Sequence, residues 1–195
     1  MRINTFFTSD THFGHANIIK YSKRPFADVE EMDNTLIHNW NAIVRPEDTV
    51  YHLGDFAVGG GPATPYLRRL NGTIHFCLGN HDKRLTKTYL DIDLELQSYL
   101  NSGAESGIPY IREVTVDKQK IILCHYAMRV WNGSHKGTWQ LYGHSHGSLP
   151  EDNTSLSCDV GVDCWNYFPV SMDQLRAKMK TKKYEPVDHH GPTTT

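Results

Sequence analysis

Five short clusters of metal-binding residue types constrain this chain more than any other feature, because each cluster begins where a strand-like run ends. The runs in question are 3–8, 49–53, 73–78, 120–124 and 138–142. The clusters that follow them are Asp10-Thr11-His12, Gly54-Asp55, Gly79-Asn80-His81-Asp82, His125 and Gly143-His144-Ser145-His146. In open α/β sheets, ligands collect beyond the carboxyl ends of the strands. We therefore expect all five clusters to meet at one edge of the fold.

Helical patterns alternate with the strand-like runs. Apolar residues recur at helical spacing over 28–44, a short helix is expected over 63–70, and Ser171 is a suitable N-cap for a closing helix over 171–182. Further strands are expected over 110–117 and 156–162, and we expect the later strands of the chain to pair antiparallel. The order of these elements predicts an α/β layered fold. We expect a single domain over 1–184 and a disordered tail over 185–195.

Composition excludes several classes of protein. The 195 residues suit one domain, and the net charge of −2 argues against holding long nucleic acid by bulk electrostatics. No apolar run approaches the roughly 20 residues of a membrane helix, so no membrane partner is expected. The four cysteines form no CxxC pair, which favours free thiols in a reducing compartment. We therefore expect a cytoplasmic protein, in the host cytoplasm if a phage encodes it.

The donor types in the clusters indicate which metals they suit. Carboxylate, imidazole and amide oxygen without thiolate favour divalent ions such as Mn²⁺, Fe²⁺ or Zn²⁺. Two such ions roughly 3.5–4 Å apart can clamp a phosphoryl group and generate a hydroxide near neutral pH. Asp55 stands alone in its cluster and is the natural carboxylate to bridge them.

The ordered set Asp-x-His, Gly-Asp, Gly-Asn-His-Asp, His and Gly-His-x-His resembles the calcineurin-like metallophosphoesterase superfamily. The segment 9–15, followed by Asn17 and Arg24-Pro25-Phe26, resembles a small bacterial and phage branch of it. The resemblance implies a four-layer α/β/β/α sandwich with a dinuclear metal site at the strand ends. It implies two divalent ions in each chain, with Mn²⁺ expected first and Fe²⁺, Zn²⁺ or Ni²⁺ as the other choices.

The resemblance also assigns roles by motif position. One metal would be held by Asp10, His12, Asp55 and His146, and the second by Asp55, Asn80, His125 and His144. His81 would bind no metal and would donate a proton to the leaving group, with Asp82 orienting it.

Substrate contacts are less sharply indicated. His15 is either a contact near the metals or the start of a helix. Asn17 and Arg24 could reach phosphate, although Arg24 could equally pack its stem over Phe26. In the loop after His125, Arg129 could meet phosphate and Trp131 could stack on a base or sugar, or Trp131 could simply anchor the loop.

These residues predict a phosphodiesterase that acts on nucleotides or on nucleic-acid ends. The alternatives are a phosphomonoesterase with the same site and a metal-binding scaffold that has lost catalysis. A structural zinc protein would instead have closed four-ligand sites. The expected partner is a phosphate ester, either a small molecule or a nucleic-acid end, and the oligomeric state stays open.

Overall fold

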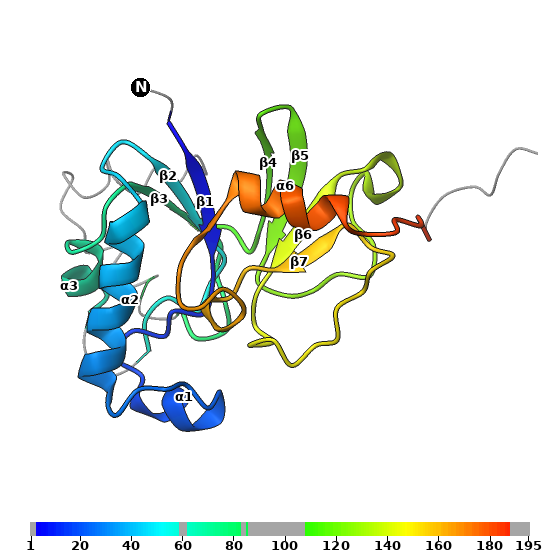
Figure 1. Ribbon diagram of the computed structural model, residues 1–195. Coiled ribbons are helices and arrows are strands. Elements are labelled where there is room, and N and C mark those ends of the chain that lie inside the picture. The colour runs from blue at the N-terminus through cyan, green and yellow to red at the C-terminus, as the bar shows by residue number, and fades with distance from the viewer. Residues whose placement is uncertain (1–2, 59–61, 83–84, 86–107, 188–195) are drawn as a thin grey trace, which may run out of the picture.

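The computed structural model describes residues 3–58, 62–82, 85 and 108–187 (Figure 1). A first sheet has the strand order β3-β2-β1-β8. Its parallel strands are β1 (Thr5–Thr8), β2 (Thr49–His52) and β3 (Thr73–Phe76), and β8 (Val170–Ser171) runs antiparallel to β1. Because β1, β2 and β3 are parallel and paired in register, their carboxyl ends and the clusters that follow them lie at one edge.

Helix α2 (Val29–Ile43) covers one face of this sheet, beside α1 (Ala16–Tyr21) and α3 (Thr64–Leu67) (Figure 1). The Asp28 side chain caps α2 by accepting the backbone N–H of Glu31. The apolar stripe of α2 is buried in one cluster with alternate residues of the three parallel strands. This cluster includes Met32, Leu36, Ile37, Trp40, Phe6, Val50 and Ile74. The predicted helices over 28–44 and 63–70 are thus confirmed, and α1 begins directly after His15, where the sequence left the start of a helix open.

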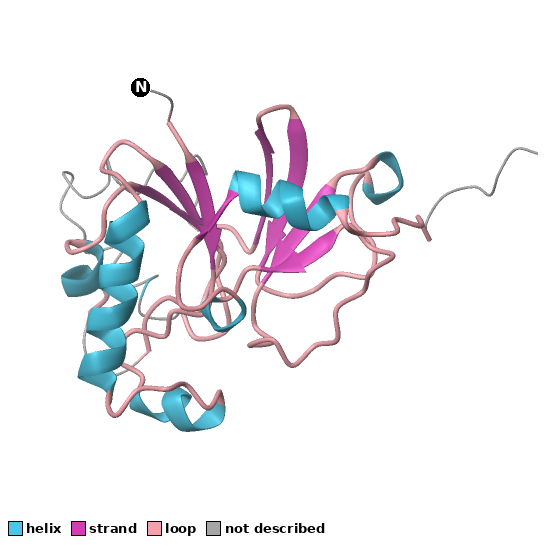
Figure 2. Cartoon of the chain, viewed as in Figure 1, coloured by secondary structure: helices cyan, strands magenta, loops and turns pink. Residues whose placement is uncertain are grey.

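A second sheet has the order β4-β5-β6-β7. Its strands are β4 (Ile111–Val116), β5 (Gln119–Cys124), β6 (Trp139–Tyr142) and β7 (Ser157–Asp159). Only β4 and β5 pair antiparallel, whereas β5, β6 and β7 are parallel. The antiparallel interpretation of these later strands was therefore wrong beyond the first pair, since long loops rather than tight turns join the others (Figure 2). The parallel arrangement brings His125 and the segment 143–146 to one edge.

The two sheets face each other across a second apolar cluster. Phe7 and Leu53 of the first sheet meet Ile121, Leu123 and Leu141 of the second. Helix α6 (Met172–Lys180) buries Met172, Leu175 and Met179 in the same cluster, and its N-terminus has a capping box between Ser171 and Gln174. The α/β sandwich predicted from the sequence is confirmed as two mixed sheets with helices.

Other expectations concern the cysteines, the membrane and the tail. All four cysteines are free; Cys77, Cys124 and Cys158 are buried and Cys164 is exposed. Among the described residues, no helix has the length and apolarity needed to cross a membrane. In the expected tail, the Glu185 N–H donates to the Thr154 carbonyl, and residues 188–195 lie outside the described part.

Candidate metal centre

The loops after β1 and β2 continue side by side beyond the sheet. The Asp10 N–H donates to the Gly54 carbonyl at 3.0 Å, and the His12 N–H donates to the Asp55 carbonyl at 3.0 Å. In the second sheet, the Gly143 N–H donates to the His125 carbonyl at 3.0 Å. The parallel pairing of the strands therefore extends into the ligand-bearing loops.

Five of the predicted ligands have left-handed backbone conformations, with φ of 59° at Asp10, 52° at His12, 56° at Asp55, 66° at His144 and 47° at His146. Non-glycine residues rarely adopt positive φ, and such strain concentrates at functional sites. Gly143 allows the close approach of the two sheets here, because a Cβ at this position would collide with the Ser9 hydroxyl and the Asp10 carboxylate.

Each of the two buried carboxylates uses one oxygen for the scaffold. Asp10 Oδ2 accepts the His144 N–H at 2.9 Å, and Asp55 Oδ1 accepts the His81 N–H at 2.8 Å. Their other oxygens face the imidazoles. Asp55 Oδ2 lies 3.5 Å from His12 Nε2 and 3.4 Å from His125 Nε2. This position between two histidines suits the bridging role expected of Asp55.

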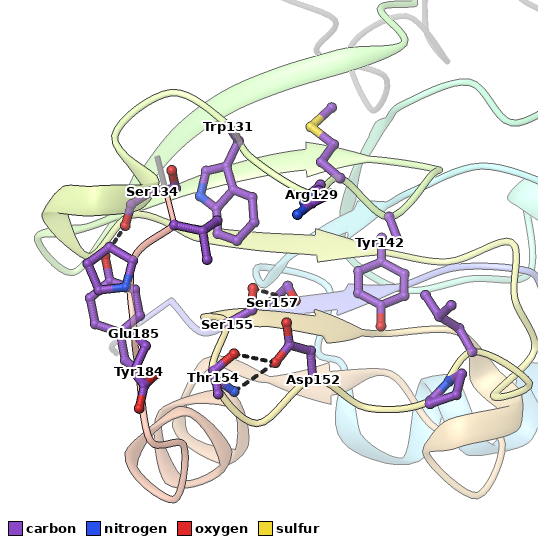
Figure 3. Close-up of a pocket in the computed structure, with 16 residues that line it drawn as sticks. Arg129, Trp131, Ser134, Tyr142, Asp152, Thr154, Ser155, Ser157, Tyr184 and Glu185 are labelled. Atoms are coloured by element: carbon purple, nitrogen blue, oxygen red, sulfur yellow. Dashed lines mark hydrogen bonds between the residues drawn. The ribbon is translucent and has the colours of Figure 1, made fainter. Parts of the chain in front are cut away.

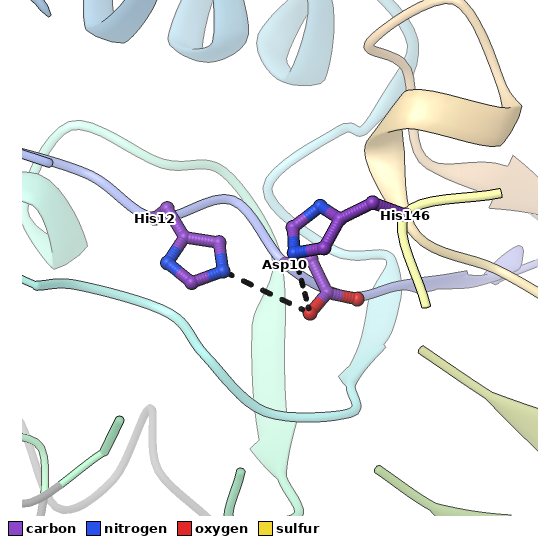
Figure 4. Close-up of side chains that lie close together, drawn as sticks. All are labelled: Asp10, His12 and His146. Carbon is purple, nitrogen blue, oxygen red and sulfur yellow. Dashed lines mark ion pairs between the residues drawn. The ribbon is translucent and has the colours of Figure 1, made fainter. Parts of the chain in front are cut away.

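The histidines are oriented in the same way. His125 Nδ1 lies 2.9 Å from the Leu53 carbonyl and His146 Nδ1 lies 2.7 Å from the Asp163 carboxylate, so each Nδ1 carries the proton and each Nε2 faces inward. Figure 4 shows His12 and His146 turned toward Asp10, each with Nε2 at 3.9 Å from its Oδ1.

The remaining two ligands are more open. Asn80 Oδ1 lies 3.1 Å from His125 Nε2, and the His144 ring lies 5.1 Å from the His125 ring, centroid to centroid. Both Asn80 and His144 are exposed. The structure thus brings all seven predicted ligands together. Two groups of them have all their ligand atoms within 4.8 Å of one another: Asp10 with His12 and His146, and Asp10 with Asp55 and His125.

Burial and charge oppose each other at this centre. Burial raises the pKa of Asp10 to about 7 and lowers the pKa of His12 to about 2. Burial would also raise the pKa of Asp55, but the hydrogen bond and charge of His125 outweigh it and lower this pKa to about 2. A neutral His12 and an ionised Asp55 are the protonation states that a metal ligand needs.

Divalent ions fit the residues present. Asp10 Oδ1 and His12 Nε2 are buried polar atoms with no hydrogen-bond partner among the described residues. Such atoms are costly unless something binds them, and both face the same point (Figure 4). Oxygen and nitrogen donors without thiolate again favour Mn²⁺, Fe²⁺ or Zn²⁺. Sequence and geometry therefore agree on a site of this kind.

His81 lies at the exposed side of the centre. Its ring is 5.7 Å from the His12 ring and 6.4 Å from the His15 ring, centroid to centroid, and its backbone is tied to Asp55. Asp82 has a different place from the one expected, because its buried carboxylate accepts three backbone N–H groups, from Asp55 at 2.7 Å, Phe56 at 2.9 Å and Gly79 at 2.7 Å. These bonds join two ligand loops and do not orient the His81 ring.

A cleft of about 650 Å³ opens over the metal ligands. Its lining includes His15, Tyr21, Lys23, Asn80, His81 and His144. His15 Nδ1 lies 3.4 Å from His12 Nδ1, and His15 is also the N-cap of α1, so its position fits both alternatives left open for it. Asn17 is exposed and does not line the cleft. The expectation that Asn17 contacts the substrate therefore gains no support from its position.

Arg24 is not a phosphate contact. It is only 4% exposed, and its guanidinium pairs with Asp163 and donates to the main-chain carbonyls of Asp10 and Thr11. Sequence reasoning missed Asp163, although it directly follows the strand-like run 156–162 in the way that the ligand clusters follow their strands. His52, at the end of β2, is buried, with Nε2 at 3.0 Å from the Thr11 hydroxyl.

Arg129 and Trp131 line a separate pocket of about 400 Å³ beside Tyr142 and the segment 184–187 (Figure 3). Trp131 is 9% exposed and its indole N–H donates to the Thr138 carbonyl at 2.8 Å. This is the loop-anchoring role left open for Trp131. Neither residue lines the cleft over the metal ligands, so the predicted substrate wall is not found there.

Comparison with known proteins agrees with this geometry. Residues 1–161 match the model of the calcineurin-like phosphoesterase superfamily domain. An uncharacterized protein of Methanocaldococcus jannaschii is 37% identical over 86% of this chain and 86% of its own length. The Gene 66 protein of a Mycobacterium phage is 27% identical over 89% of this chain and 94% of its own.

Among solved structures, a protein of unknown function from Aquifex aeolicus has the same fold, with a TM-score of 0.66 and 21% identity. That match covers 91% of this chain and 100% of the other.

Proposed function

Because this chain belongs to the calcineurin-like phosphoesterase superfamily, we propose that it is a dinuclear phosphodiesterase that hydrolyses nucleotides or nucleic-acid ends. The observation that carries the proposal is the position of the free ligand atoms. Asp55 Oδ2 lies between His12 Nε2 and His125 Nε2, while Asp10 Oδ1 faces His12 and His146. This arrangement offers two adjacent binding points that share one carboxylate, as a two-metal hydrolase requires.

In this proposal, Asp10, His12, Asp55 and His146 hold one ion, and Asp55, Asn80, His125 and His144 hold the other. Bound there, the two ions supply positive charge for the phosphate oxygens and a water acidic enough to act as nucleophile near neutral pH. Mn²⁺ is the proposed native ion among the three, Mn²⁺, Fe²⁺ and Zn²⁺, that oxygen and nitrogen donors without thiolate favour.

His81 is the proposed general acid. It is exposed to the cleft, it is not needed as a ligand, and its backbone bond to Asp55 fixes its distance from the metal centre. A protonated imidazole here gives its proton to the ester oxygen as that oxygen leaves phosphorus. Proton donation matters most for alkoxide leaving groups such as those of nucleoside esters.

Support for a nucleotide substrate comes from the rim of the cleft. Tyr21 is 72% exposed beside the cleft, and its ring lies 6.3 Å from that of His15. An exposed aromatic ring within reach of a phosphate site can stack on a base. Tyr21 therefore takes the role that the sequence had suggested for Trp131.

The test is a panel of substrates for the Mn²⁺-loaded protein. It contains a nitrophenyl diester and monoester, cyclic nucleotides, and oligonucleotides with phosphate at either end. We expect diesters to turn over faster than monoesters, a chelator to abolish activity and Mn²⁺ to restore it. Faster monoester hydrolysis would make the protein a phosphatase. If the protein binds two ions per chain and hydrolyses none of these substrates, it is a metal-binding scaffold without catalytic activity.

A further inference from the structure

A buried ion pair behind the metal centre joins segments far apart in the chain. Arg24 lies in the turn after α1, and Asp163 lies 139 residues later in the short helix η2 (Val162–Cys164). Arg24 Nε donates to Asp163 Oδ1 and Arg24 Nη2 to Asp163 Oδ2, both at 2.8 Å. This two-pronged geometry is the one in which a guanidinium binds a carboxylate most specifically.

The other donors of Arg24 reach the ligand loop after β1. Nη2 donates to the Asp10 carbonyl at 2.6 Å and Nη1 to the Thr11 carbonyl at 3.1 Å, while the last N–H of Nη1 meets Met32 Sδ at 3.4 Å. All five N–H groups of Arg24 are thus engaged within the protein. Two of them hold the turn in which Asp10 and His12 have positive φ.

Asp163 in turn contacts a predicted ligand directly. Its Oδ2 lies 2.7 Å from His146 Nδ1. An ionised carboxylate can only accept a hydrogen bond, so a neutral His146 must carry its proton on Nδ1. The lone pair of His146 is then on Nε2, the atom that lies 3.9 Å from Asp10 Oδ1. The pair thus touches both sides of one metal position: the Asp10 turn through Arg24 and His146 through Asp163.

We infer that Arg24 and Asp163 are positioning residues that set the tautomer of His146 and hold the Asp10–His12 turn, so that this metal position is formed before the ion binds. The inference rests on the proposed dinuclear site. A lysine could not replace Arg24, because a single ammonium cannot make the paired bonds to Asp163 and reach both carbonyls. The carboxylate partner neutralises a positive charge that would otherwise repel the ion.

A merely structural ion pair would affect stability without distinguishing one metal position from the other. The chain offers a control in Arg176 and Asp117, an arginine–aspartate pair at 2.8 Å whose side chains are 30% and 44% exposed and do not line the cleft. Asp117→Asn removes the same kind of charge as Asp163→Asn.

The first experiment reads the tautomer in the unmodified protein. Long-range ¹H–¹⁵N spectra of the His146 ring, assigned by comparison with His146→Ala, are recorded with a chelator and then with Zn²⁺. We expect the proton on Nδ1 in both. A neutral ring with its proton on Nε2, or averaging between the two nitrogens in the chelated sample, would overturn the inference. Apart from His146→Ala, which serves only for the assignment, this measurement requires no variant to fold.

The second experiment titrates Mn²⁺ into Asp163→Asn, Arg24→Lys and Asp117→Asn by calorimetry. For Asp163→Asn we expect the dissociation constant to rise roughly 10–100-fold at one of the two sites. This is the usual effect of losing a residue that hydrogen-bonds to a metal ligand. Arg24→Lys weakens the same site less, and Asp117→Asn changes neither. Equal weakening at both sites, or none in Asp163→Asn, would contradict a positioning role.

The two proposals fail in different ways. If the unmodified protein binds no Mn²⁺, the proposed function fails, and the positioning of a metal ligand fails with it. If the unmodified protein binds two ions and Asp163→Asn binds them equally well, only the positioning inference fails.

Discussion

The two sides of the metal centre differ in how firmly the protein holds their ligands. The buried half consists of Asp10, His12 and His146, with side chains 0%, 2% and 20% exposed. The open half consists of Asn80, His125 and His144, of which only His125 is buried. Asp55 lies between the halves. The buried half has Asp163 and Arg24 behind it. In the open half, the Leu53 carbonyl orients His125, and the Tyr126 hydroxyl donates to Asn80 Oδ1 at 3.4 Å.

This difference separates two tasks of a two-metal hydrolase. Ligands that are already fixed lose little conformational freedom when an ion binds, so the buried half should hold its ion more tightly. Exposed ligands next to His81 leave room for a substrate phosphate to approach from the cleft. We therefore expect the buried half to retain its ion and the open half to exchange it more readily.

Substitution of the shared carboxylate, Asp55, should affect the two halves equally. Asp55→Asn removes the charge that serves both halves, so both ions should weaken together. The loss of activity should exceed the roughly 10²–10⁴-fold that a single general acid contributes. Metal content after dialysis and turnover of a nitrophenyl diester measure the two effects. If one ion stays bound with unchanged affinity, Asp55 does not bridge.

His81 tests whether substrate approaches from the open half. His81→Ala should keep both ions, because His81 is not a ligand in the proposed site. It should lose about 10²–10⁴-fold in rate on a nucleoside ester and little on a nitrophenyl ester, whose leaving group needs no proton. Rates on both esters, with metal content measured in parallel, decide the matter. Equal losses on the two esters would exclude the leaving-group role.

The halves can also be separated by titration. In the unmodified protein, Mn²⁺ should bind in two steps that differ by about 10–100-fold, since the described residues place a carboxylate behind a histidine only in the buried half. His144→Ala should remove the weaker step and His146→Ala the tighter one. Calorimetry of the two variants checks this order. The same residual step in both variants would show that the halves are not distinct.

The sequence predicted equally well that the side chains of the buried half and of the open half meet, because each of these residues follows a strand end. Parallel strands that pair in register end at one edge of the sheet. Clusters that directly follow such strands are therefore neighbours in space, although they are far apart along the chain. The pair of Arg24 and Asp163 could not be predicted in this way. Its partners are 139 residues apart, and no local pattern encodes a contact between a turn and a distant short helix.

The errors have a similar origin. The direction of β6 and β7 depends on how long loops return, which hydrophobic alternation does not record. Trp131 looked like a stacking surface because its loop is rich in aromatic and basic residues. Its burial and its bond to the Thr138 carbonyl become visible only in three dimensions.

The smallest expected effect concerns His52, which lies behind the turn of the buried half and beside the loop that carries Asp55. The Thr11 hydroxyl donates to the Phe56 carbonyl at 2.8 Å, so it accepts from His52 Nε2–H. The Gly54 N–H donates to His52 Nδ1 at 3.3 Å. A second proton would have to sit on Nδ1, facing that N–H. Burial lowers the pKa of His52 to about 3 from 6.5, which agrees with a permanently neutral ring.

A lowered pKa fixes the sign of the pH dependence. The stabilisation is fully present above pH 6.5 and is lost as pH falls toward 3, because the unfolded chain then binds a proton that the folded one does not. Between pH 7 and pH 5, this one group should cost about 2 kcal/mol of the free energy of unfolding. His52→Gln should remove that part of the pH dependence, while His38→Gln, at an exposed position on α2, should not. Urea unfolding of the three proteins at both pH values, with a chelator present, measures the difference. If His52→Gln loses as much stability on acidification as the unmodified protein, the neutral His52 is not part of what holds the two loops together.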